Sequence, residues 1–68
     1  MEHEYQDRVV EEKKVLDEKL AALTKFNAGV QFPDLDEDHQ ALLERQLTVM
    51  TEYSQILGER IRLWTEEG

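Results

Sequence analysis

The chain has 68 residues, with no cysteine, one proline and three glycines, and it carries 16 Asp and Glu against 8 Lys and Arg. A chain this short buries only about 60% of its unfolded surface when it folds alone, so a further source of stability is expected. Without a thiol, that source is neither a disulfide nor a thiolate zinc site. The remaining sources of stability are self-association and a bound ligand.

Charge and hydropathy exclude two further classes of protein. The formal net charge of −8 argues against general nucleic-acid binding, which requires a basic face. No apolar run approaches the roughly 20 residues that span a bilayer, and the N-terminus lacks a secretory signal. We therefore expect a soluble intracellular protein that binds neither membranes nor long nucleic acids. Residues 2–26 hold five of the eight bases, so an anion site is expected in the first half.

The first predicted element is an amphipathic helix over residues 3–26, which contain no Gly or Pro. Its end is predicted at the sequence Asn27-Ala28-Gly29, where Asn27 or Gly29 can adopt a left-handed conformation. The apolar residues that recur at spacings of three, four or seven are Val9, Leu16, Leu20 and Leu23.

A loop is predicted over residues 27–35, with Phe32 biased toward extended structure because a proline follows it. Asp34 or Asp36 is expected to cap a second helix over residues 36–64. A connection this short folds two helices into an antiparallel hairpin. The predicted fold class is therefore all-α.

The second helix has an apolar arc wider than one neighbouring helix can cover. One stripe contains Leu43, Leu47, Met50, Leu57, Ile61 and Trp64, and a second contains Leu42, Val49, Tyr53, Ile56 and Leu63. We therefore expect residues 1–68 to form one helical-hairpin domain that assembles into a helical homo-oligomer, at least a dimer. Gly58 lies within this helix at a cost of about 1 kcal/mol relative to Ala. Either a ligand or neighbouring backbone comes close there, or the glycine is simply tolerated.

The sequence offers little for catalysis. It has no Ser/His/Asp or Cys/His arrangement and no glycine-rich phosphate loop. Asp34, Asp36 and Asp38 have the spacing that opens a calcium loop. However, His39 replaces the required glycine and Arg45 the required bidentate glutamate. We expect no catalytic residue, no metal ligand and no cofactor, and hence a binding protein rather than an enzyme.

Tyr5, Glu12, Lys19 and Phe26 recur every seven residues along the edge of the first helix. This line is typical of a coiled-coil flank, in which the charged groups stay solvated. It also fits a site where an aromatic ring stacks on a nucleobase and a cation holds a phosphate. Tyr5 and Lys19 are about 21 Å apart on one helix. Two first helices crossing antiparallel around Glu12 would place Tyr5 of one chain opposite Lys19 of the other.

Other polar residues have two interpretations each. Arg8 follows Glu4 by one turn, so it is either the partner of Glu4 in an ion pair or a second phosphate donor. Lys25 either complements the helix dipole or borders the same site. Polar contacts to another chain are expected from Arg45, Thr48 and Thr51.

The whole chain follows the pattern Tyr5-x-x-Arg8-Val9-x-x-Glu12-x-x-x-Leu16-x-x-Lys19-Leu20-x-x-Leu23-x-x-Phe26, then Phe32-x-x-Leu35, then Leu42-Leu43-x-x-Gln46-Leu47-x-x-Met50-x-x-Tyr53-x-x-Ile56-Leu57-x-x-Arg60-Ile61. This order and spacing resembles the small helical-hairpin family of bacteriophages whose characterised members are anti-CBASS and anti-Thoeris signal sponges.

The resemblance implies a homohexamer of hairpins in the host bacterial cytoplasm. Such a protein sequesters cyclic dinucleotides such as cGAMP, and in some members cyclic trinucleotides, without cleaving them, so that CBASS-type effectors stay inactive. In anti-CBASS members an aromatic residue stacks on the bases and a lysine holds the phosphates. Those roles fall here to Tyr5 and Lys19, with Arg8, Glu12 and Lys25 as further candidate ligand-binding residues. The alternative hypothesis is an acidic helical oligomer that acts as an adaptor on a host protein.

Overall fold

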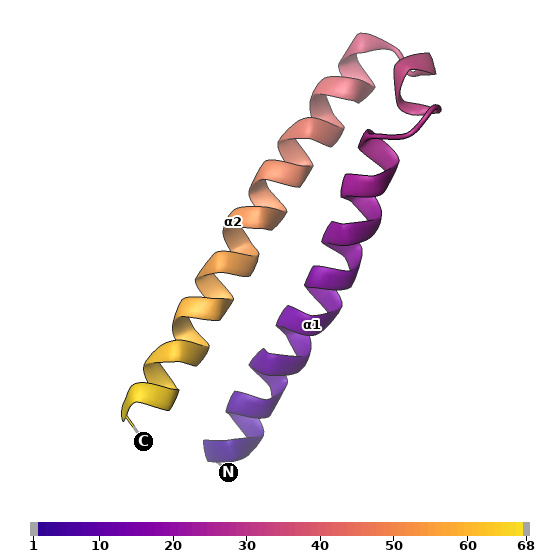
Figure 1. The fold of residues 1–68 in the computed structure, drawn as a ribbon. Helices are drawn as coiled ribbons and strands as arrows, with labels where there is room; N and C mark the ends of the chain where they lie inside the picture. The colour runs from indigo at the N-terminus through magenta and orange to yellow at the C-terminus, as the bar shows by residue number, and fades with distance from the viewer. Residues whose placement is uncertain (1, 68) are drawn as a thin grey trace.

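The computed structural model describes residues 2–67, which form two long helices and one short turn of 3-10 helix. Helix α1 spans Glu2–Asn27, the 3-10 turn η1 spans Phe32–Asp34, and α2 spans Glu37–Glu67. The two helices run antiparallel, with both chain ends at the same end of the hairpin (Figure 1). The predicted all-α hairpin is therefore confirmed, with each helix slightly longer at its C-terminal end than expected.

The hairpin is a rod rather than a sphere. Its extents are 48 × 15 × 14 Å and its radius of gyration is 15.4 Å, whereas a compact domain of this length has a radius of about 11 Å. Such a shape leaves one long flank of each helix without a neighbour. Within the described residues, neither helix has an apolar stretch sufficient to cross a membrane.

A small apolar core joins the two helices. Val9 and Leu16 of α1 are buried against Leu57 of α2, which has no exposed surface. Met50, Ile61 and Trp64 pack against this core and are partly buried. All six lie on the predicted stripes, so the 3.6-residue periodicity identified the inward faces correctly.

A polar network crosses the helix pair beside the core. Ser54 of α2, 8% exposed, donates a hydrogen bond from its hydroxyl to the Asp17 carboxylate of α1. The other Asp17 oxygen accepts from Lys13 Nζ at 2.7 Å. These two partners, Lys13 first, lower the pKa of Asp17 below its ordinary value of 3.8. A Cβ atom at Gly58 would lie 3.2 Å from Lys13 Cε. The group that approaches this glycine in the hairpin is therefore a side chain of the same chain.

The end of α1 differs from the prediction. No glycine and no other described residue has a positive φ, so the expected left-handed conformation at Asn27 or Gly29 is wrong. The helix instead ends in a tighter turn, where the Gly29 N–H donates to the Phe26 carbonyl at 3.0 Å. A Cβ at Gly29 would meet that same oxygen at 3.3 Å. Glycine is favoured here because the Phe26 carbonyl oxygen leaves little room for a Cβ atom, and not because the backbone is left-handed.

The loop between the two helices also differs from the prediction, because it contains a turn of 3-10 helix. Phe32 begins η1 and is not extended as predicted, and the extended residue is Leu35, with ψ of 152°. The physical reason is the Gln40 side chain, whose Nε2 lies 3.1, 3.3 and 2.8 Å from the carbonyl oxygens of Phe32, Pro33 and Leu35 respectively. One amide group thereby holds the turn onto the first turn of α2.

Asp36 occupies the N-cap position of α2, which resolves the choice between Asp34 and Asp36. Its carbonyl accepts the first helical hydrogen bond, from the Gln40 N–H at 3.0 Å. Its carboxylate pairs with His39 Nδ1, and this contact is the largest cause that lowers the pKa of Asp36. A carboxylate here also complements the positive end of the helix dipole.

Candidate functional site

The predicted heptad line on α1 is exposed along its whole length. Tyr5 has 55% of its surface accessible and Phe26 37%, and Glu12 and Lys19 between them are exposed as well. The hairpin therefore leaves this line free for a ligand or another chain.

A groove of about 480 Å³ runs beside that line, between α1 and α2. It gathers three of the predicted site residues, Arg8, Glu12 and Lys19. The remaining lining residues are Glu11, Val15, Leu16 and Tyr53. The structure thus brings the central part of the predicted site together within a single chain.

The groove combines separated charges with an apolar surface. Arg8 and Lys19 lie about 16 Å apart along the helix, with the carboxylates of Glu11 and Glu12 between them in sequence. Tyr53, 40% exposed, contributes a ring from α2. Two cations at that separation cannot both contact one phosphate. The acids between them penalise an anion placed midway.

Tyr5 lies outside the groove, in a cluster at the open end of the hairpin. Its ring makes an edge contact with Trp64 at 5.8 Å between centroids and 69° between planes. The Arg60 guanidinium carbon lies 5.8 Å from the Tyr5 centroid and 6.0 Å from that of Trp64. Arg60 also donates a hydrogen bond to the Tyr5 hydroxyl. The ring is thus held in place by an aromatic and a cation while half of it faces outward.

Arg60 and Trp64 are the residues that sequence reasoning missed as site candidates. A signal for them existed, because they lie one turn apart near the end of α2, and an antiparallel hairpin places that end beside Tyr5. The sequence pattern places Trp64 on the core stripe, and it is indeed partly buried there.

The structure places the predicted site residues Arg8 and Lys25 in different surroundings. Arg8 makes no ion pair with Glu4 in the described part of the chain, so that interpretation is wrong and the side chain lines the groove instead. Lys25 is exposed in the last turn of α1 and does not line the groove. Its position complements the helix dipole, about 9 Å beyond Lys19 along the axis.

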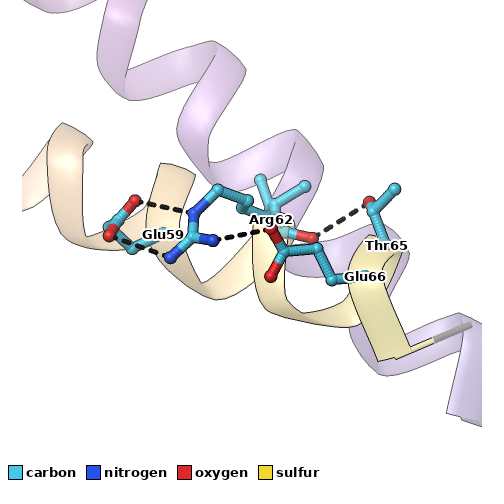
Figure 2. Close-up of polar contacts among 5 residues, drawn as sticks. Glu59, Arg62, Thr65 and Glu66 are labelled. Atoms are coloured by element: carbon cyan, nitrogen blue, oxygen red, sulfur yellow. Dashed lines mark hydrogen bonds and ion pairs between the residues drawn. The ribbon is translucent and has the colours of Figure 1, made fainter.

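The charges on α2 are partly compensated. The Arg62 guanidinium lies between two carboxylates, with Nε 3.1 Å from Glu59 Oε2 and Nη1 2.8 Å from Glu66 Oε1 (Figure 2). The pKa of Glu59 is lowered by this contact, and that of Arg62 is raised. Arg62 is therefore a poor candidate for binding an anionic ligand. Arg45, in contrast, has no carboxylate partner among the described side chains.

The threonines of α2 form bonds within their own helix. Thr48 donates to the Glu44 carbonyl at 3.2 Å and Thr51 to the Leu47 carbonyl at 2.8 Å. Their predicted contacts to another chain remain a prediction. Among the residues whose side chains are described, no group of three His, Asp or Glu could hold a metal ion.

One known family covers most of the chain. The family described as Sequestin matches residues 3–63 of the chain. The chain belongs to the Sequestin family. Its name indicates sequestration, which agrees with the expectation of a sequestering protein. Within this Sequestin chain, Tyr5, Arg60 and the whole groove lie inside the matched span, and Trp64 is the next residue after it. No curated protein and no solved structure matches the chain.

Proposed function

We propose that this Sequestin protein is a phage anti-defence sponge that binds cyclic oligonucleotide immune signals and sequesters them without cleavage. The ligands are cyclic dinucleotides such as cGAMP, with cyclic trinucleotides as a second class. Binding in the host bacterial cytoplasm keeps the signal from CBASS-type effectors. Membership of the family supports sequestration, and the residues exposed on one flank of the hairpin support the choice of ligand.

The observation that carries the proposal is the pairing of an outward aromatic ring with two cations on the same flank of α1. Tyr5 is fixed by Arg60 and Trp64 and still exposes 55% of its surface, as stacking on a base requires. Arg8 and Lys19 lie farther along α1, in the groove, where they can donate charge-assisted hydrogen bonds to phosphates.

One chain alone offers an incomplete site. Tyr5 and Lys19 are about 21 Å apart along α1, too far for both to contact one cyclic dinucleotide. In the proposed assembly, two α1 helices cross antiparallel around Glu12, and Tyr5 of each chain lies opposite Lys19 of the other. The crossing then forms two equivalent sites about 21 Å apart, each with the Tyr5 ring of one chain and the Lys19 ammonium group of the other. Three such dimers form the proposed homohexamer.

The mechanism is mass action, with no bond formed or broken. The protein lowers the free concentration of the signal, so high affinity and high copy number determine the effect. Its net charge of −8 repels a dianion at long range. Screening over about 8 Å at physiological salt leaves the nearest cations to dominate inside the site.

The test is a thermal-shift screen of the purified protein with 3′,3′-linked and mixed-linkage cyclic dinucleotides, cyclic triadenylate and cyclic ADP-ribose isomers. A ligand at 100 times its dissociation constant stabilises the folded state by about 2.7 kcal/mol. Bound ligand is then released by denaturation and analysed by chromatography. We expect a shift with at least one cyclic oligonucleotide and recovery of the intact ligand. Recovery of a linear product would show cleavage and overturn the sponge mechanism.

The site assignment is tested with matched variants. Tyr5→Ala and Lys19→Ala are expected to abolish the shift, because each removes one of the two recognition groups. Tyr5→Phe is expected to retain most of it, since the stacking surface remains when the hydroxyl bonded to Arg60 is lost. Lys14→Ala is the control, because Lys14 lines a groove on α1 that contains none of the predicted site residues. Capture that survives both alanine changes would remove Tyr5 and Lys19 from the site.

The second candidate is a protein adaptor, which the exposed apolar residues of α2 favour. Val49 is 64% exposed and Ile56 52%, and a host protein is one class of partner for such a surface. An adaptor would show no thermal shift with any nucleotide in the panel.

A further inference from the structure

One row of apolar side chains on α2 faces away from the hairpin core. Leu42 is 57% exposed, Val49 64%, Ile56 52% and Leu63 48%. They lie seven residues apart, so they form a continuous seam along the helix, called here the outer seam. An exposed apolar seam with a strict heptad repeat is typical of a helix that packs against a second helix.

The amount of exposed surface also indicates a missing partner. The chain exposes 5542 Å², whereas a compact monomer of 8.0 kDa exposes about 4,450 Å². The excess of about 1,100 Å² exceeds the roughly 800 Å² that each partner contributes to a standard interface. A second copy of the same chain carries an equally long seam with the same excess.

The charges beside the outer seam favour one orientation of that copy, because only one orientation gives Arg45 a carboxylate partner. Arg45, Glu52 and Glu59 lie three residues after Leu42, Val49 and Ile56, along one flank of the seam. In a two-fold antiparallel helix pair each flank meets the same flank of the other helix. Arg45 then lies beside Glu59 of the second copy, twice per pair. In a parallel pair Arg45 would instead meet Gln46, and Glu59 would meet Arg60 on the same flank. Arg60 is already bonded to the Tyr5 hydroxyl of its own chain, and Arg45 would stay without a carboxylate partner.

We propose that a second copy of this chain packs antiparallel on the outer seam, with the two-fold axis passing between Glu52 and Tyr53. In this register Leu42 lies opposite Leu63 of the second copy, and Val49 lies opposite Ile56. The two Tyr53 rings approach each other near the axis on one flank, and the two Glu52 carboxylates approach each other on the other flank. This like-charge contact offsets part of the gain from the two Arg45–Glu59 pairs. Arg45, without a carboxylate partner among the described side chains, gains one.

The proposed contact changes the ligand site, and in this respect the inference rests on the proposed function. Tyr53 lines the groove with Arg8 and Lys19, and it lies on the same helix face as Val49 and Ile56, at spacings of four and three residues. A helix seated on the outer seam therefore closes that side of the groove. This contact is distinct from the crossing of two α1 helices, so one chain has two self-complementary faces. Two different two-fold contacts on one chain are one way to build a closed assembly larger than a dimer.

The test uses the absence of cysteine from the chain. Single-cysteine variants are oxidised at low protein concentration, and cross-linked dimers are separated by non-reducing electrophoresis. A 1:1 mixture of Val49→Cys and Ile56→Cys is expected to form a heterodimer, and Tyr53→Cys is expected to cross-link with itself. Leu42→Cys alone is expected to remain monomeric, because its antiparallel partner position is Leu63. Glu18→Cys, on α1 and away from the seam, measures random collision.

Each outcome decides the proposal. Efficient self-linking of Leu42→Cys would show a parallel pair and overturn the register. If every seam variant cross-linked only as much as Glu18→Cys, the contact between two copies would be disproved. The outer seam would then be a surface for a protein of another sequence. As an independent check, Ile56→Asp is expected to reduce the mass of the assembly measured by light scattering. Val10→Asp, at a similarly exposed apolar position on α1, should not. No ligand is present in either experiment, so failure here is distinguishable from failure of nucleotide capture.

Discussion

The two sides of α2 carry similar residues and have opposite surroundings. On the inner side Leu57 has no exposed surface and Ser54 is 8% exposed. On the outer side Ile56, one residue before Leu57, is 52% exposed. The hairpin therefore buries only part of the apolar surface that its longer helix provides. Stability of the fold rests on the inner side, and the outer side is the face that the proposed second copy would cover.

The largest expected difference between the two sides comes from truncating a leucine or isoleucine. Leu57→Ala is expected to lower the free energy of unfolding by about 3 kcal/mol, because it leaves a cavity in the small core between the two helices. Ile56→Ala is expected to cost under about 1 kcal/mol in dilute protein, where its side chain is half exposed. Urea unfolding followed by circular dichroism at two protein concentrations measures both.

Protein concentration separates the two variants further. The Leu57→Ala loss should be the same at both concentrations, whereas the Ile56→Ala loss should grow as chains associate. Equal losses that do not depend on concentration would contradict the distinction between an inner and an outer side.

A smaller effect is expected from the polar network on the inner side. The pKa of Asp17 is lowered in the folded chain, mainly by Lys13 and then by Ser54. The unfolded chain therefore takes up this proton at higher pH than the folded chain does. The network stabilises the fold above the ordinary pKa of 3.8, and this contribution is lost as pH falls through the lower folded pKa.

Thermal unfolding of Asp17→Asn against pH measures this contribution. The variant is expected to have a lower Tm than the parent at pH 7, and the difference should shrink as the pH approaches 3. Asp7→Asn, an exposed carboxylate on the same helix, controls for removal of one negative charge. A pH profile of Asp17→Asn that runs parallel to that of the parent would show that the network adds nothing.

The smallest expected effect is at Gly58. Alanine raises helix propensity by about 1 kcal/mol, but its Cβ would press on Lys13 Cε at 3.2 Å. Because the end of a lysine side chain moves easily, Gly58→Ala is expected to stabilise the hairpin by about 0.5 kcal/mol. In a Lys13→Ala background the gain should reach about 1 kcal/mol. Destabilisation by Gly58→Ala in both backgrounds, measured by urea unfolding, would point to a neighbour other than Lys13.

Periodic features of the sequence predicted the fold well. The stripes through Val9, Leu16 and Leu57 identified the core, and the exposed positions of the second stripe identified the face that the hairpin leaves uncovered. Hydrophobic spacing succeeds here because a two-helix hairpin has one interface and little choice of partner.

Features that depend on one side chain reaching across the fold were not predictable. Phe32 was expected to be extended from a local rule, but the Gln40 amide holds three carbonyls of the loop in a tighter turn. The contact between Arg60 and Tyr5 is likewise beyond local rules, because it joins residues 55 positions apart. Such contacts follow from the fold and become visible only after the helices are placed.

Trp64 is the only tryptophan in the sequence, and its ring touches Tyr5 and lies 6.0 Å from the Arg60 guanidinium. Indole fluorescence is sensitive to nearby charge and to aromatic neighbours, so this side chain is an intrinsic optical probe of the open end of the hairpin. A base that stacks on Tyr5, or a phosphate that draws Arg60 away, should change the emission without any label. Rapid mixing could then time the capture of a signal molecule in the unmodified protein.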